Sequence, residues 1–464
     1  MKKLVFGILA LLLIGVAVYW FFHRDNDKAR DVLPENASAA VVFEPAELFR
    51  ELDFPLDKVS KLVLNLEDLM DAIDLKKPVY AFASEDGLSG VALNLKDADK
   101  LLKAATTFSY ASEKQKGYQW IANSNSIGCL DTDKLLLLYP VPETQQEDLR
   151  DKMVKLMTQK RKDVPVLELA EGQEGVVQAC TALAALPKQY AKSLPADIDL
   201  SNAFLSAALR MDEKAIAYSM KVEGAENLSV PLAPIKGNLI GLEPEEPLVW
   251  ACVNMKGEEL LALLRKENQL RTALLALNMC IDADMMIKAI DGDVTIAIPE
   301  VEERPNFLLT ATLSNTDFLE NADDWKGGGS VSFSKRGKAD FLIVLDNNVE
   351  VFFGVRDGKL YIASNEELAD KACQKADAEN YQKEAKGRYL SASFDVEKLF
   401  QDLRRRPSTM SIVLSLPQIR EVTDALERVS LTADSPQGVE LSLKTNKPVK
   451  DIYSNFFSML TGEK

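Results

Sequence analysis

The feature that most constrains the fold is an order of apolar patterns that recurs on both sides of a proline-rich stretch, residues 229–247. The recurring unit is a short apolar run, typical of a buried strand, followed by apolar residues at i, i+3, i+4 and i+7, typical of an amphipathic helix. It begins at positions 39 and 91 before the stretch, and at positions 249, 308 and 390 after it. We therefore expect a duplicated domain and not a single large core.

The other patterns recur in the same order. Each half has a further strand, then a hairpin, then an acidic helix, then two closing strands. The strands are expected at 78–84 and 293–298, the hairpins from 117–121 with 135–139 and from 349–354 with 359–364, the acidic helices at 143–159 and 365–376, and the closing pairs at 204–210 with 215–222 and at 429–433 with 439–444. The predicted fold class is α+β, with two tandemly duplicated domains of mostly antiparallel sheet covered by helices. The domains are predicted at 34–228 and 248–450, with 229–247 as a linker and 451–464 as a C-terminal segment.

The N-terminus predicts a transmembrane helix. Lys2 and Lys3 precede residues 4–22, which carry no charge and are long enough to cross a hydrocarbon layer of about 30 Å as a helix. We interpret residues 1–24 as an uncleaved signal anchor and 25–33 as a tether. A cleaved signal peptide is the alternative, because Gly15 and Ala17 form a small-x-small pattern. The two lysines place the N-terminus in the cytoplasm, so the bulk of the chain is expected in a bacterial periplasm or outside the cell.

Only one histidine is present, His23, and it lies at the edge of this apolar segment. The rest of the chain must therefore work without imidazole, which excludes Ser-His-Asp and Cys-His catalysis and histidine-ligated metals there. The formal net charge of −16 disfavours nucleic acid as a partner, because such a chain repels the phosphate backbone.

The other candidate motifs are weak. Ser332 and Lys335 form an SxxK pattern within a strand-like run, and residues 326–330 resemble a phosphate loop without its GK[ST] ending. The five cysteines are expected as buried free thiols, since no CxxC pair occurs and their number is odd. These are Cys129, Cys180, Cys252, Cys280 and Cys373.

Acidic residues give two further candidates and aromatic residues give one. The acidic cluster that could hold a hard cation is Asp282, Asp284, Asp291 and Asp293, although its spacing is not that of an EF-hand. The run Glu-Val-Glu-Glu at 300–303 could pair locally with Arg304, and glycosidase-type acid catalysis would need two such carboxylates held several ångström apart. Trp120, Trp250 and Trp325 are expected in the core, with a sugar-stacking surface as the alternative. We predict no catalytic, cofactor-binding or metal-ligating residue and no cofactor.

Several segments resemble an uncharacterised family of Bacteroidales cell-envelope proteins, the domain-of-unknown-function 4836 type. The segments that carry the resemblance are LPENASAAVV from residue 33, DLKKPVYAF from 74, KDADKL from 96 and GYQW from 117. The resemblance implies an envelope location and a fold shared over most of residues 30–450. Members of the family are typically lipoproteins, whereas this chain has no lipobox cysteine, and the family supplies no activity or site residues.

These patterns predict a non-enzymatic, membrane-anchored extracytoplasmic protein that binds a partner protein or acts as an envelope scaffold. Its expected partners are the cell membrane, through residues 4–22, and an envelope protein. One alternative is a binder of an apolar or lipid-like ligand held between sheet and helices, which a large apolar cavity would favour. The other is a hydrolase that uses carboxylates alone, which two convergent buried carboxyl groups would favour.

Overall fold

The computed structural model describes residues 28–52, 66–160, 163–186, 200–225, 232–242, 246–266, 268–300, 306–328, 332–345, 349–375, 377–405, 414 and 416–461. The chain divides into unit 1, which is residues 1–227 together with 447–464, and unit 2, residues 228–446. The predicted anchor at 4–22 and His23 lie outside the described residues. Among the residues that are described, no helix is both long and apolar enough to span a membrane.

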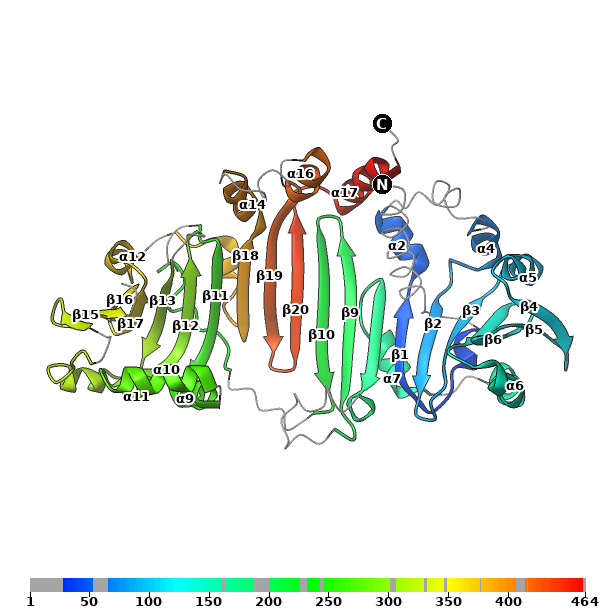
Figure 1. Ribbon diagram of the computed structural model, residues 1–464, viewed down its shortest axis with the longest axis horizontal. Helices are drawn as coiled ribbons and strands as arrows, with labels where there is room; N and C mark the ends of the chain where they lie inside the picture. The colour runs from blue at the N-terminus through cyan, green and yellow to red at the C-terminus, as the bar shows by residue number, and fades with distance from the viewer. Residues whose placement is uncertain are drawn as a thin grey trace. The chain divides into compact units, whose positions relative to one another are not determined.

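Unit 1 is built on an antiparallel sheet (Figure 1). Its strands are β1 (Ala37–Phe43), β2 (Val79–Ser84), β3 (Ser89–Asn94), β4 (Ala111–Gln115), β5 (Tyr118–Asn123), β6 (Ser126–Leu130), β7 (Lys134–Leu138), β8 (Val177–Ala182), β9 (Phe204–Asp212) and β10 (Ala215–Glu223). Their order across the sheet is β10-β9-β8-β1-β2-β3-β7-β6-β5-β4, with every pairing antiparallel.

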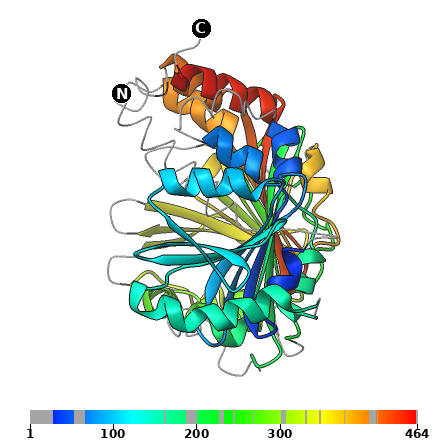
Figure 2. The same cartoon turned by 90° about the vertical axis from the view of Figure 1, so that its right-hand side faces the viewer.

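Helices cover both faces of this sheet. They are η1 (Arg30–Val32), α2 (Pro45–Leu52), α4 (Leu66–Ala72), α5 (Ala98–Thr107), α6 (Glu143–Thr158), α7 (Pro165–Glu171), η2 (Leu183–Ala185) and α17 (Val449–Thr461). Figure 2 faces unit 1 and shows strands β4 to β7 between α5 on one side and α6 on the other. Helix α7 packs on β1 and β8. The buried apolar side chains of the sheet and these helices form one continuous core.

Unit 2 has its own antiparallel sheet. Its strands are β11 (Val249–Lys256), β12 (Ile290–Ile298), β13 (Leu308–Leu313), β14 (Ser332–Lys335), β15 (Asp340–Leu345), β16 (Val349–Arg356), β17 (Lys359–Ala363), β18 (Leu390–Asp395), β19 (Leu426–Ser435) and β20 (Gly438–Thr445). Their order is β20-β19-β18-β11-β12-β13-β17-β16-β15-β14. Counted along the chain, this is the order found in unit 1, which the predicted duplication requires.

The helices of unit 2 are α9 (Gly257–Lys266), α10 (Asn268–Asn278), α11 (Ala283–Lys288), η3 (Asp317–Asn321), α12 (Glu366–Lys371), α13 (Asn380–Lys383), α14 (Val396–Arg405) and α16 (Pro417–Thr423). Helices α9, α10 and α11 pack on one another between β11 and β12 in the chain. Helix α12 packs on β16 and β17, and α14 packs on β19.

The predicted α+β class, with antiparallel sheets and covering helices, is confirmed, but some elements differ from the prediction. Residues 117–121 do not pair with 135–139, because β6 lies between β5 and β7 and pairs with both. The second predicted hairpin is correct: β16 pairs with β17, and Asp357 and Gly358 form the turn at φ 48° and 70°. The acidic helix expected at 365–376 is shorter, since α12 ends at Lys371. The amphipathic helix expected after the strand that begins at 308 is only a 3₁₀ turn, η3.

Residues 232–242 of the proline-rich stretch belong to unit 2 and pack against it. Asp293, fully buried on β12, accepts backbone N–H groups of Lys236 (2.8 Å) and Asn238 (2.8 Å). Ile235 packs in a small core with Trp250 of β11. These hydrogen bonds compensate the unfavourable burial of the Asp293 charge. They also hold residues 232–242 against β12 by specific contacts.

Candidate functional site

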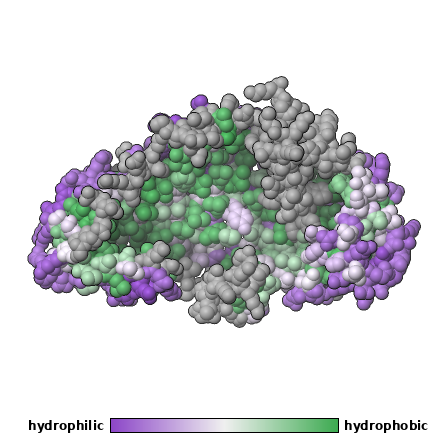
Figure 3. All heavy atoms as spheres, viewed as in Figure 1, coloured by the Kyte–Doolittle hydropathy of each residue, from purple (hydrophilic) through white to green (hydrophobic). Residues whose placement is uncertain are grey.

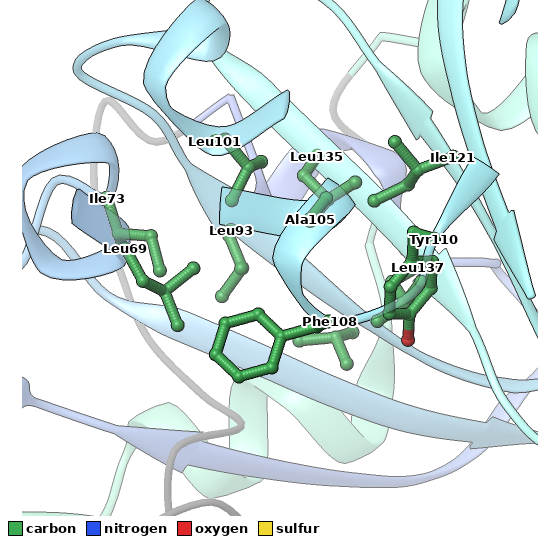
Figure 4. Close-up of a pocket in the computed structure, with 11 residues that line it drawn as sticks. Leu69, Ile73, Leu93, Leu101, Ala105, Phe108, Tyr110, Ile121, Leu135 and Leu137 are labelled. Atoms are coloured by element: carbon green, nitrogen blue, oxygen red, sulfur yellow. The ribbon is translucent and has the colours of Figure 1, made fainter. Parts of the chain in front are cut away.

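An apolar pocket of about 210 Å³ lies in unit 1 between two helices and the sheet (Figure 4). Helix α4 and the residue that follows it form one wall, α5 another, and strands β3, β5 and β7 the floor. The lining residues are Leu69, Ile73, Val91, Leu93, Leu101, Ala105, Phe108, Tyr110, Ile121, Leu135 and Leu137. Phe108 is 44% exposed, so the pocket reaches the surface beside its ring.

Strand periodicity places the floor residues on one face. Val91 pairs with Leu137 and Leu93 with Leu135, so the four side chains of β3 and β7 point to the same side of the sheet. Gly128 of β6 has no side chain, and this leaves room for the side chain of Ile121 on the neighbouring strand β5. A Cβ at Gly128 would lie only 2.7 Å from that side chain.

Helix α5 presents Leu101 and Ala105 to the pocket because residues four apart share a helix face. Its start is fixed by Asp97, whose side chain accepts the backbone N–H of Lys100 at 3.0 Å. Two ion pairs join α5 to α4: Lys100 with Asp71 at 2.7 Å and Lys103 with Asp68 at 3.8 Å. The hydrogen bond from Lys100 lowers the pKa of Asp71. These groups are exposed, so the pairs orient the wall and contribute little free energy.

The described side chains that line the pocket present a hydrocarbon surface to a ligand. Among the described residues no charged side chain lines it, and the one polar side-chain atom in this part of its lining, the Tyr110 hydroxyl, is hydrogen-bonded to the Ser126 hydroxyl at 2.9 Å. An enclosed surface of this kind gains free energy by removing apolar groups from water. The described lining can therefore bind an apolar group by burying it.

The acidic residues singled out in the sequence do not converge. Asp293 holds the 232–242 segment, while Asp284 pairs with Arg265 and accepts the Asn278 amide at 2.8 Å. Asp282 accepts a bond of 3.3 Å from Asn321, and Asp291 is exposed. Within the described ranges, no group of three or more potential ligands could hold a metal ion.

The remaining sequence candidates also lie apart. Ser332 and Lys335 sit on β14, where residues three apart point to opposite faces, and Lys335 pairs with Asp323 at 2.6 Å. Glu300 is exposed, whereas Glu303, Arg304 and Ser330 lie outside the described residues. All five cysteines are free, and only Cys373 is not buried. Trp120 and Trp250 are fully buried core residues, as expected.

Sequence reasoning did not find the pocket residues, because each belongs to an ordinary core pattern. A second surface was also missed, on α9, α10, α11 and the turn between α10 and α11 of unit 2, where large apolar side chains are exposed. They are Leu263 (42%), Leu270 (48%), Leu275 (62%), Met279 (85%) and Met285 (43%). Exposed large apolar side chains on neighbouring helices are typical of interaction sites. Figure 3 shows a further apolar area over β19 and β20, where Leu441 is 45% exposed.

The comparisons with known proteins give a family but no activity. No curated protein matches the chain. Solved structures of TP0453 are similar to part of this chain, at 13% sequence identity. The match with crystal form III covers 45% of this chain and 82% of the TP0453 chain, at a TM-score of 0.31. Crystal form IV covers 41% and 78% at a TM-score of 0.29. Scores this low support no conclusion about function. The family model for a domain of unknown function, DUF4836, matches residues 69–447. The chain therefore belongs to the DUF4836 family.

Proposed function

We propose that this protein is a non-catalytic binding protein of the cell envelope, and that unit 1 holds an apolar ligand in the pocket between α4, α5 and the sheet. The observation that carries the proposal is the pocket itself, about 210 Å³ lined by hydrocarbon and open beside Phe108. Apolar cavities of about 150 Å³ already accept benzene. An alkyl chain fits this chemistry, because each buried methylene contributes about 0.8 kcal/mol and needs no polar partner.

A polar headgroup would remain outside. Phe108 marks the opening, and the ion pairs of Lys100 and Lys103 lie on the α4–α5 wall. The ligand class is therefore an amphiphile or lipid fragment with one apolar tail, and specificity comes from tail length and width.

Binding of decanoate to the full chain, held in lipid nanodiscs with empty nanodiscs as the blank, tests this proposal. Ala105→Trp fills the pocket from α5 and should weaken binding at least tenfold. Thr106→Trp is the matched control, because Thr106 is exposed on the same helix, and it should bind like the parent. Equal binding by both variants would place the ligand elsewhere.

The envelope location rests on the sequence of residues 4–22. The proposed orientation leaves units 1 and 2 outside the cytoplasm, anchored by that segment. A reporter that is active only outside the cytoplasm should be active when fused after Lys464, and the protein should stay with membranes after an alkaline wash. Recovery in the soluble fraction with a new N-terminus near Val18 would favour a cleaved signal peptide.

The exposed apolar side chains of α9 to α11 favour a second role, binding of a partner protein at the envelope. Met279 and Leu275 are the most exposed of these residues. A photo-crosslinking residue at Met279 should give one defined adduct in cells, and Leu275→Asp should abolish it. An adduct that persists unchanged in Leu275→Asp would count against this surface.

A further inference from the structure

We infer that unit 2 fills its counterpart of the unit 1 pocket with its own aromatic side chains, so that each chain binds one apolar ligand, in unit 1 only. This inference rests on the proposed function. It assigns different roles to two units that share one strand order.

The counterpart is located by topology. In unit 1 the pocket lies over β3, β7 and β5, beneath the helix that follows β3 and the helix that precedes β2. The strands in the same places of unit 2 are β13, β17 and β15. The covering elements are η3, which follows β13, and α11, which precedes β12.

Aromatic rings occupy this place in unit 2. Trp325, which follows η3, lies 5.1 Å from the Phe341 ring of β15 and 6.1 Å from the Phe353 ring of β16, measured between ring centroids. Phe341 and Phe353 stack on each other at 5.2 Å. The same core includes Ala311 of β13, Leu360 of β17, Phe318 of η3 and Met286 of α11. The elements that border a pocket in unit 1 therefore converge on a packed cluster in unit 2.

Three local differences account for the filling. The ten-residue helix α5 is replaced by η3, a five-residue 3₁₀ turn. Strand β6 has Gly128 on the pocket side, whereas its counterpart β16 directs Phe353 into the cluster. The aromatic residue that follows the covering helix also differs in exposure: Phe108, directly after α5, is 44% exposed, whereas Trp325, four residues after the end of η3, is only 8% exposed.

The Trp325 indole is held by ring packing. Its Nε1 is buried and has no hydrogen-bond partner among the described residues. An unmade bond of this kind is unfavourable. The indole therefore owes its position to the fit of its rings, as expected of a side chain that fills a space.

Equilibrium dialysis of labelled decanoate against the full chain in nanodiscs, corrected with empty nanodiscs, measures the number of sites. The parent protein should bind one decanoate per chain, and Ala105→Trp should bind none. Trp325→Ala should raise the number to two, because it removes the largest ring of the cluster. Phe341→Leu is a milder opening in case Trp325→Ala does not fold, and native circular dichroism is required of each variant.

The outcomes separate this inference from the proposed function. A parent protein that binds no decanoate would overturn the proposed function. Two sites in the parent would overturn the inference while leaving the unit 1 pocket intact. One site that survives Ala105→Trp would overturn both, because it places the ligand outside the unit 1 pocket. A folded Trp325→Ala variant that still binds one decanoate would show that the aromatic cluster is not what closes unit 2.

Discussion

Glu171 and Asp86 of unit 1 each pair with a cation, but in different surroundings. Arg30 donates from Nε and Nη2 to the two carboxylate oxygens of Glu171, at 2.7 and 2.9 Å. The Arg30 side chain is only 4% exposed and the Glu171 side chain 0%. Asp86 pairs with Lys152, and both side chains are about 40% exposed. The buried pair fixes η1 on α7, whereas the exposed pair is screened by water. Burial therefore decides which of the two matters for stability.

Glu171→Gln should lower the free energy of unfolding of unit 1 by about 3–5 kcal/mol, because it removes a buried carboxylate that makes two hydrogen bonds with the buried Arg30 guanidinium. Urea unfolding monitored by circular dichroism measures the change. Glu367→Gln is the control, since the Glu367–Lys371 pair is exposed and should contribute less than about 0.5 kcal/mol. A loss as small in Glu171→Gln as in the control would contradict this account.

Asp86 predicts a pH-dependent difference in stability between the parent protein and an Asp86→Asn variant. Hydrogen bonds from Lys152 and Ser84 lower its pKa to about 2, below the value of about 3.9 for an unfolded chain. The carboxylate therefore contributes stability above about pH 4, and that contribution is lost as the pH falls towards 2. Asp86→Asn should be less stable than the parent at pH 7, by under about 1 kcal/mol because the site is exposed, and the difference should shrink below about pH 4 and vanish as the pH falls through about 2. A difference that is constant from pH 7 to pH 2 would exclude the ionised carboxylate as its source.

Secondary-structure elements with a clear apolar period were predictable from the sequence, and those without one were not. The run 349–364 predicted β16 and β17 because it alternates around an Asp-Gly turn. Strand β4 was missed because all its residues are exposed and polar or small. Strand β6 was missed because all its residues are buried, so it shows no alternation. The pocket depends on the register between β3 and β7 and on one glycine of β6, and neither is visible in a local pattern.

The positions of the cysteines on these elements predict their reactivity. Burial raises the pKa of Cys129 on β6 to about 12 and that of Cys180 on β8 to about 11. Cys252 and Cys280 are also buried, and Cys373 alone is partly exposed. Because the thiolate is the reactive form, an aromatic disulfide reagent should label one thiol in the folded protein and five after unfolding. Peptide mapping should find the native label on Cys373. Labelling of Cys129 before unfolding would contradict the packing of β6.

At the scale of the molecule, the chain returns to unit 1 after completing unit 2. The sequence predicted a separate C-terminal segment from residue 451, but helix α17 begins at Val449 and belongs to unit 1. Its Val449 is 6% exposed in the unit 1 core, and the Val449 N–H donates to the Glu213 carbonyl at 2.8 Å. No local pattern could reveal this, because the partners lie more than 200 positions earlier.

Removal of residues 447–464 should therefore weaken unit 1 and leave unit 2 unchanged. Helix α17 packs on α2, and burial of Tyr453 raises its pKa to about 12. Loss of these contacts exposes apolar surface of α2 and frees the turn between β9 and β10, where Glu213 lies. Hydrogen exchange measured by mass spectrometry should speed up in α2, β9 and β10, while amides of β11, β12 and β18 keep the parent rates. Truncation after Thr461 is the matched control and should change neither set. Faster exchange in β11, β12 and β18 as well would mean that unit 2 needs α17 to fold, contrary to its assignment to unit 1.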